Sequence, residues 1–155
     1  MMAPIKHRGP DAESIFINDK IALGHYRLSI IDIDGGYQPR IDNENKNYLV
    51  FNGEIYEYKK HAKLLQSYGI NLKDQSDTEV LFQSLIHLGV EKTLEMIDGM
   101  YAFVFYEGKN DTIWLIRDPM GEKPLYYSTF KNNIYFSSEA SGVVASNTNK
   151  PKNIN

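Results

Sequence analysis

The chain contains no cysteine among its 155 residues, and this absence excludes several kinds of chemistry at once. Disulfide bridges, thiolate metal sites and catalysis by a cysteine thiolate cannot occur within the chain as written. The four histidines, His7, His25, His61 and His87, lack the spacing of a metal motif, so we expect no bound metal.

Long hydrophobic runs and blocks of like charge are also missing. The longest apolar run, residues 101–106, is far shorter than the roughly 20 residues that span a bilayer, and no signal-peptide pattern opens the sequence. The net charge is −3, from 17 basic and 20 acidic residues, so no strong field attracts nucleic acid or an anionic membrane. A glycine-rich phosphate loop is absent as well. We therefore expect a cytoplasmic protein whose partner is a small ligand or another soluble protein.

Turn and cap signals divide the chain into strands and helices. Asn18-Asp19 suits a tight hairpin, and Ser76 with Glu79 forms a capping box at the start of a helix that Gly89 ends. We expect strands at residues 14–17, 20–26, 48–51, 101–107, 112–117, 125–130 and 134–138, and helices at 56–68, 76–88 and 91–97. This order predicts an α+β domain over residues 1–145, with helices packed on antiparallel sheets. Residues 146–155, rich in Asn, Lys and Pro, are typical of a linker or disordered tail.

The dipeptide Asn52-Gly53 follows a continuous apolar strand and has two interpretations. Asn-Gly is the strongest short-range signal of a two-residue hairpin turn. The residues that follow, however, enter a helical pattern and not a return strand. A strand that ends in a glycine bend would place a side-chain amide and a backbone N–H side by side, which suits an oxyanion hole. Asn52 and Gly53 are therefore candidate catalytic donors, with a hairpin as the alternative.

Arg27 and Asp77 have structural interpretations when they are taken alone. Arg27 would be an arginine at the edge of a sheet, paired with one of the acidic side chains. Asp77 would stabilise the first turn of a helix, where backbone N–H groups are unpaired. Composition by itself therefore gives neither residue a function.

Five ordered blocks of residues nevertheless resemble the glutaminase domain of asparagine synthetases. The blocks are His7-Arg8-Gly9-Pro10-Asp11, Arg27-Leu28-Ser29-Ile30-Ile31-Asp32, Asn52-Gly53-Glu54-Ile55-Tyr56, Ser76-Asp77-Thr78-Glu79 and residues 117–127. The resemblance runs from about residue 7 to 139. It implies the N-terminal-nucleophile hydrolase architecture, two stacked antiparallel β-sheets flanked by helices, here without the family's N-terminal strand and helix.

The resemblance also implies roles in binding L-glutamine. Substrate contacts would come from Arg27, Leu28, Ile30, Glu54 and Asp77, and the oxyanion hole from Asn52 and Gly53. Arg27 would receive the α-carboxylate, because a guanidinium matches a carboxylate bidentately. Asp77 would receive the α-ammonium with Glu54 beside it. This pair of opposite charges would identify a free amino acid as the substrate.

In such enzymes an N-terminal cysteine attacks the glutamine side-chain amide. The ammonia passes to a C-terminal synthetase domain, which uses ATP and Mg²⁺ to amidate aspartate. This chain begins with Met1-Met2, and a thioether cannot become a nucleophile. We therefore expect a fragment truncated at both ends that is inactive alone, with ATP and Mg²⁺ bound only in the missing synthetase domain.

Three functions fit these observations. The first is part of a glutamine-hydrolysing asparagine synthetase or a close amidotransferase, which an upstream in-frame cysteine codon would support. The second is a non-catalytic glutamine-binding or regulatory module that keeps the charged contacts. The third is a structural or interaction domain, which would not respond to glutamine.

Overall fold

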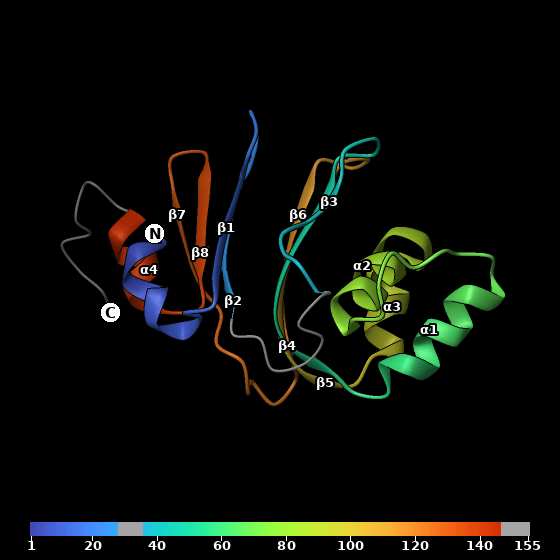
Figure 1. Cartoon of the computed structure of the whole chain (residues 1–155). Coiled ribbons are helices and arrows are strands. Elements are labelled where there is room, and N and C mark those ends of the chain that lie inside the picture. Colours follow the sequence, from blue (N-terminus) through green and yellow to red (C-terminus); the bar gives the residue numbers. More distant parts are fainter. Residues whose placement is uncertain (28–35, 147–155) are drawn as a thin grey trace.

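The computed structural model describes residues 1–27 and 36–146, which form four layers in the order helix, sheet, sheet, helix (Figure 1). The strands are β1 (Ala12–Ile17), β2 (Ala22–Arg27), β3 (Arg40–Asp42), β4 (Asn47–Ile55), β5 (Gly99–Glu107), β6 (Thr112–Arg117), β7 (Tyr126–Phe130) and β8 (Asn133–Ser137). The helices are the 3₁₀-helix η1 (Ala3–Arg8), α1 (Tyr58–Ser67), α2 (Asp77–Leu88), α3 (Val90–Met96) and α4 (Ala140–Ser146). The predicted α+β class, with stacked antiparallel β-sheets flanked by helices, is confirmed.

The inner sheet has the order β3-β4-β5-β6, with antiparallel neighbours throughout. Its centre is the apolar run of β4, which is buried on both faces as the sequence predicted. Leu49 and Phe51 point into the core beneath the helices, while Tyr48 and Val50 point into the core between the two sheet layers. Because side chains alternate across a strand, one continuous apolar run serves both cores.

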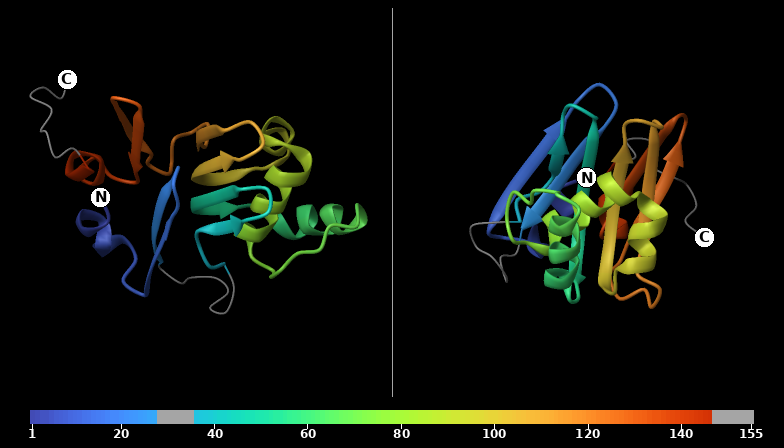
Figure 2. Two further views of the ribbon diagram at one scale, coloured as in Figure 1. Left: turned by 90° about the horizontal axis from the view of Figure 1, so that it is seen from above. Right: turned by 90° about the vertical axis from the view of Figure 1, so that its right-hand side faces the viewer.

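The second layer consists of two hairpins, β1-β2 and β7-β8, which are not hydrogen-bonded to each other. Figure 2 shows both hairpins in one layer, with η1 and α4 outside them. Leu23 is buried between the layers, and Phe16 and Phe136 pack beside it. The two hairpins therefore share one core with the inner sheet although they do not share a ladder.

Helix α2 begins where the capping box predicted. The Ser76 hydroxyl accepts a hydrogen bond from the Glu79 backbone N–H at 3.1 Å, which satisfies one unpaired donor of the first turn. The helix is buried along most of its length, and Phe82 is 2% exposed. Helices α1 and α3 also lie within one or two residues of their predicted bounds.

The prediction that the central strand ends at Asn52-Gly53 is wrong, and so is the hairpin alternative. β4 continues to Ile55 and pairs with β5 over its whole second half, with Gly53 opposite Tyr101. Gly53 has φ 149°, and a Cβ there would collide with the Met100 carbonyl oxygen. The glycine is thus required for a close approach of two strands and not for a bend.

Three short elements were not predicted. η1 contains Pro4 within its first turn, and a single 3₁₀ turn has little periodicity to detect. β3 arises from pairing with β4, with Arg40 opposite Leu49, within a segment that is locally polar. α4 is short and has no charged residue in its sequence. Residues 147–155 lie outside the described part of the chain, so the domain boundary and the tail stay predictions.

Replacing Gly53 with alanine is expected to lower the free energy of unfolding by about 3 kcal/mol, from strained backbone and steric overlap. Gly69 provides the matched control, since it has φ 78° but nothing within 4 Å of an added Cβ. Gly69→Ala should cost only about 1 kcal/mol. Urea unfolding followed by circular dichroism measures both, and equal losses would contradict the close-approach argument.

Candidate functional site

A hollow of about 300 Å³ opens where the ends of β2 and β4 meet the start of α2. Five of the seven predicted site residues line it: Arg27, Asn52, Gly53, Glu54 and Asp77. They come from three elements that are far apart in the sequence. The remaining two, Leu28 and Ile30, lie outside the described residues.

Asn52 offers an unused hydrogen-bond donor to this hollow. Its Nδ2 atom is buried and has no hydrogen-bond partner among the described residues. An unsatisfied buried donor costs about 1–3 kcal/mol, so such a group is retained where something else supplies the acceptor. The neighbouring backbone at Gly53 lines the same hollow. This arrangement can receive an oxygen that carries developing negative charge.

Asp77 faces the sheet, and the residue that caps the helix is Ser76. The Asp77 Oδ2 atom accepts a hydrogen bond from the Ile55 backbone N–H at 3.1 Å. Burial raises the pKa of Asp77, although the hydrogen bonds from Ile55 and Thr78 oppose this, and the charge of Glu54 raises the pKa further. A cationic ligand between Asp77 and Glu54 would relieve this electrostatic cost.

Arg27 lies at the end of β2, half-buried, with its guanidinium 5.1 Å from the centre of the Tyr37 ring. This cation–π contact restrains the guanidinium. The hollow thus holds positive charge on Arg27 and negative charge on Asp77 and Glu54. Arg8 and Lys123 also line it.

Sequence reasoning missed Gln38, which supports the site from the loop before β3. Its Oε1 atom accepts a hydrogen bond from the Phe51 backbone N–H at 2.6 Å, and its carbonyl oxygen accepts one from the Ser14 hydroxyl. The first bond holds β4 one residue before Asn52, and the second joins the same loop to β1. A Gln-Pro pair is a turn signal only, so nothing local in the sequence could have revealed this contact.

Lys123 was also missed, although it belongs to the block at residues 117–127, to which no task was assigned. Asp118 holds its backbone by accepting hydrogen bonds from the N–H groups of Tyr101, Glu122 and Lys123. Arg117 donates to the Lys123 carbonyl oxygen at 2.6 Å. The loop is therefore fixed, and the signal that could have found Lys123 was the block itself.

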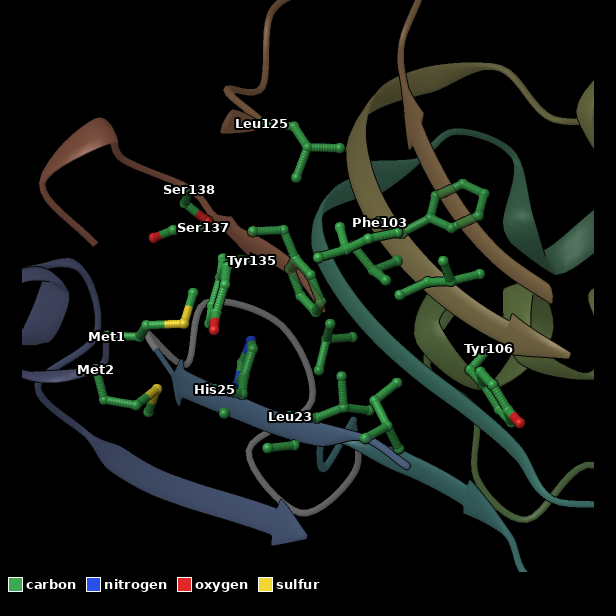
Figure 3. A pocket seen from close by; sticks show the side chains of 18 of the residues that line it. Met1, Met2, Leu23, His25, Phe103, Tyr106, Leu125, Tyr135, Ser137 and Ser138 are labelled. Atoms are coloured by element: carbon green, nitrogen blue, oxygen red, sulfur yellow. The ribbon is translucent and has the colours of Figure 1, made fainter. Parts of the chain in front are cut away.

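A second, larger cavity of about 630 Å³ lies between the two sheet layers (Figure 3). His25, Phe51 and Asn52 line both this cavity and the site hollow. The His25 side chain is hydrogen-bonded to the Phe51 backbone, yet burial, with a smaller effect of the Arg27 charge, lowers its pKa to about 4. His25 is thus a neutral imidazole at neutral pH, placed where the two spaces meet.

Within residues 1–27 and 36–146 there is no group of three or more His, Asp or Glu side chains that could hold a metal ion. None of the helices in this part of the chain is long and apolar enough to cross a membrane.

Comparison with known proteins shows the class to which this chain belongs. The chain matches the family described as "Glutamine amidotransferase domain" over residues 1–154, and it belongs to that family. Among solved structures it is similar to the glutamine phosphoribosylpyrophosphate amidotransferase of Bacillus subtilis, with a TM-score of 0.63 and 26% identity, covering 78% of this chain and 28% of that one. A structure titled as the allosteric regulatory enzyme of purine biosynthesis gives a TM-score of 0.64 at 27% identity, with the same coverage.

Within that class the relatives by sequence are asparagine synthetases, which confirms the predicted resemblance. Asparagine synthetase [glutamine-hydrolyzing] 1 of Bacillus subtilis is 38% identical over 87% of this chain and 21% of its own length. A putative asparagine synthetase of Methanocaldococcus jannaschii is 38% identical over 100% of this chain and 33% of its own. Asparagine synthetase B of Escherichia coli is 36% identical over 90% and 25%. The chain therefore spans between about a fifth and a third of the length of these relatives.

The neutral state of His25 predicts a pH dependence of folding. Because the unfolded chain binds a proton on His25 near pH 6.5 and the folded chain only near pH 4, stability is lost as the pH falls through this window. The loss attributable to His25 should be about 3 kcal/mol. In urea unfolding at pH 7 and pH 4, His25→Gln should lose less stability than the natural chain by that amount. His87→Gln, at an exposed helical position, should behave like the natural chain, and equal slopes for all three proteins would contradict the assignment.

Proposed function

We propose that the chain is the glutamine-binding glutaminase domain of an asparagine synthetase-like amidotransferase. The observation that supports this best is the content of the hollow: a guanidinium, two carboxylates and an unpaired buried amide donor lie around one space. Opposite charges suit the two ends of a free α-amino acid, and the amide donor suits the carbonyl oxygen of its side chain. The volume of about 300 Å³ lies within the range of small-ligand sites.

In this proposal Arg27 pairs with the glutamine α-carboxylate through two parallel N–H bonds. Asp77 and Glu54 receive the α-ammonium, which offsets the electrostatic cost of the buried Asp77 carboxylate. Leu28 and Ile30 contribute contacts beside the substrate. The substrate is then held at its charged end, and its amide points toward β4.

Asn52 and Gly53 act on the reacting carbonyl. Attack on the side-chain amide moves negative charge onto the carbonyl oxygen, and N–H donors already in place stabilise that charge without reorganising. The attacking group of the family is a cysteine thiolate, which is not present among these 155 residues. The residues described here therefore bind and polarise glutamine, while the nucleophile is supplied by another segment.

The activity proposed for the complete enzyme extends beyond this domain. Its relatives are named glutamine-hydrolysing asparagine synthetases, so the ammonia released here would pass to a synthetase domain that amidates aspartate. ATP and Mg²⁺ would bind in that domain. We place the complete enzyme in the cytoplasm, as expected for biosynthesis of a free amino acid.

A non-catalytic glutamine-binding or regulatory module is the second candidate. The observation in its favour is that the charged contacts lie around one hollow in a chain without cysteine. Such a module would use the same hollow to sense glutamine.

Glutamine binding tests the charged contacts. In isothermal titration, Arg27→Met and Asp77→Asn should each weaken L-glutamine binding by about a hundredfold, because each leaves one charged end of the ligand unpaired. Lys60→Met is the matched control, since its ion pair with Glu57 is exposed on α1. Its affinity should match that of the natural chain. Binding that is unchanged in both site variants would refute the assignment of Arg27 and Asp77 as the residues that pair with the charged ends of glutamine.

Hydrolysis tests the division between binding and attack. The purified chain should release no glutamate or ammonia from glutamine above a blank without protein, because no thiolate is available. Coupled glutamate dehydrogenase assays measure the release. Turnover that Asn52→Ala abolishes would instead show that the chain supplies a different nucleophile. Binding without turnover is the expected result.

A further inference from the structure

We propose that a buried ion-pair network centred on Arg40 and Asp74 positions both charged ends of the glutamine clamp, Arg27 and Asp77. The proposal rests on the proposed function, because the network would position residues whose proposed role is to bind glutamine. Arg40 begins β3, and Asp74 lies in the segment before α2. The network contains a third charged residue, Glu79, on the first turns of α2.

The network is mostly buried, with Asp74 at its more exposed end. Arg40 Nη2 lies 2.5 Å from Asp74 Oδ2, and Arg40 Nη1 lies 3.4 Å from Glu79 Oε2. The Arg40 side chain is 11% exposed and that of Glu79 is 0% exposed. Glu79 Oε1 also accepts hydrogen bonds from the Lys73 backbone N–H at 3.0 Å and from the Gln83 side-chain amide at 2.9 Å. The guanidinium therefore donates a hydrogen bond to Asp74 and lies at ion-pair distance from Glu79, so it contacts carboxylates on either side of the helix cap.

One arm of the network reaches Asp77 through the helix cap. The Ser76 hydroxyl donates to Asp74 Oδ1 at 2.6 Å and accepts from Arg40 Nη2 at 3.0 Å. The Ser76 backbone N–H also donates to Asp74, at 2.9 Å. Since Ser76 is bonded directly to Asp77, these three contacts fix the turn that directs the Asp77 carboxylate toward β4.

The other arm reaches Arg27. The Gly36 backbone N–H donates to Asp74 Oδ2 at 3.4 Å, and Gly36 precedes Tyr37, the ring that lies against the Arg27 guanidinium. A Cβ placed on Gly36 would lie 3.6 Å from the Ser76 side chain and 3.9 Å from Arg27 Nη2. Asp74 thus accepts hydrogen bonds from the segment that carries Asp77 and from the segment whose Tyr37 ring lies against Arg27.

The ionisation of Asp74 is consistent with this role. Burial alone would raise its pKa, but the hydrogen bonds from Ser76 and the contact with Arg40 lower the pKa below its ordinary value. The Asp74 carboxylate is therefore charged at neutral pH. A loss of its charge would loosen both arms together, while the clamp residues themselves would remain.

Three ligands separate a positioning role from a merely structural one. L-glutamine carries both charged ends, 5-amino-5-oxopentanoate lacks the α-ammonium, and 4-aminobutanamide lacks the α-carboxylate. The natural chain should bind glutamine at least about tenfold more tightly than either truncated ligand, because each truncation removes one ion pair. In Asp74→Asn this preference should fall to about threefold or less. The displaced Arg27 and Asp77 would no longer form ion pairs with both charged ends of glutamine.

The matched control is Glu57→Gln, which removes a carboxylate whose ion pair is exposed and should keep the full preference. Arg40→Lys extends the test if Asp74→Asn fails to fold, since one ammonium cannot bridge both carboxylates. The Ile55 amide proton, which is bonded to Asp77, should change its NMR shift in both network variants. The proposal would be overturned by a folded network variant whose preference for glutamine stays within twofold of that of the natural chain. It would also be overturned by a variant that binds all three ligands more weakly by the same factor. Failure of the natural chain to bind glutamine would instead overturn the proposed function.

Discussion

The pairing of β4 with β5 along eight residue pairs is the constraint on which the rest of the structure depends. The first half of β4 supplies side chains to both hydrophobic cores, and its second half supplies Asn52, Gly53 and Glu54 to the hollow. Because the strand is continuous, the packing of its apolar half sets the position of its polar half. The close approach of Gly53 to Met100 keeps the two strands together at this point. Asn52 and Gly53, the proposed oxyanion donors, are therefore held by the buried apolar half of the same strand.

The hydrogen bond from Ile55 to Asp77 then connects this strand to α2. It explains why an aspartate at the first helical position is directed away from its own helix. Ser76 already satisfies the cap, so Asp77 is released for another use. This position buries the Asp77 carboxylate and raises its pKa. A raised carboxylate pKa is more typical of binding sites than of helix caps on the surface.

Much of this arrangement could be predicted from sequence because its signals are local. The capping box gave the start of α2, and the apolar run gave the buried core of β4. The motif blocks named five residues that do line one hollow. The errors concern contacts between distant segments: Gly53 was assigned to a bend because nothing in its neighbourhood reveals the approach of Met100. Arg40 and Gln38 went unnoticed for the same reason, since their partners are 34 and 13 residues away in the chain.

Recognition and attack are physically separable tasks in this domain. Recognition needs charges and donors at fixed positions, and the strands, the helix cap and the buried ion pairs provide these through backbone register and packing. Attack needs one ionisable atom placed at the carbonyl carbon, which can be contributed by any segment that reaches the hollow. An unpaired amide and a desolvated carboxylate each cost free energy in the empty site. Both features support the proposal that the hollow binds a ligand, whether or not the same chain carries the nucleophile.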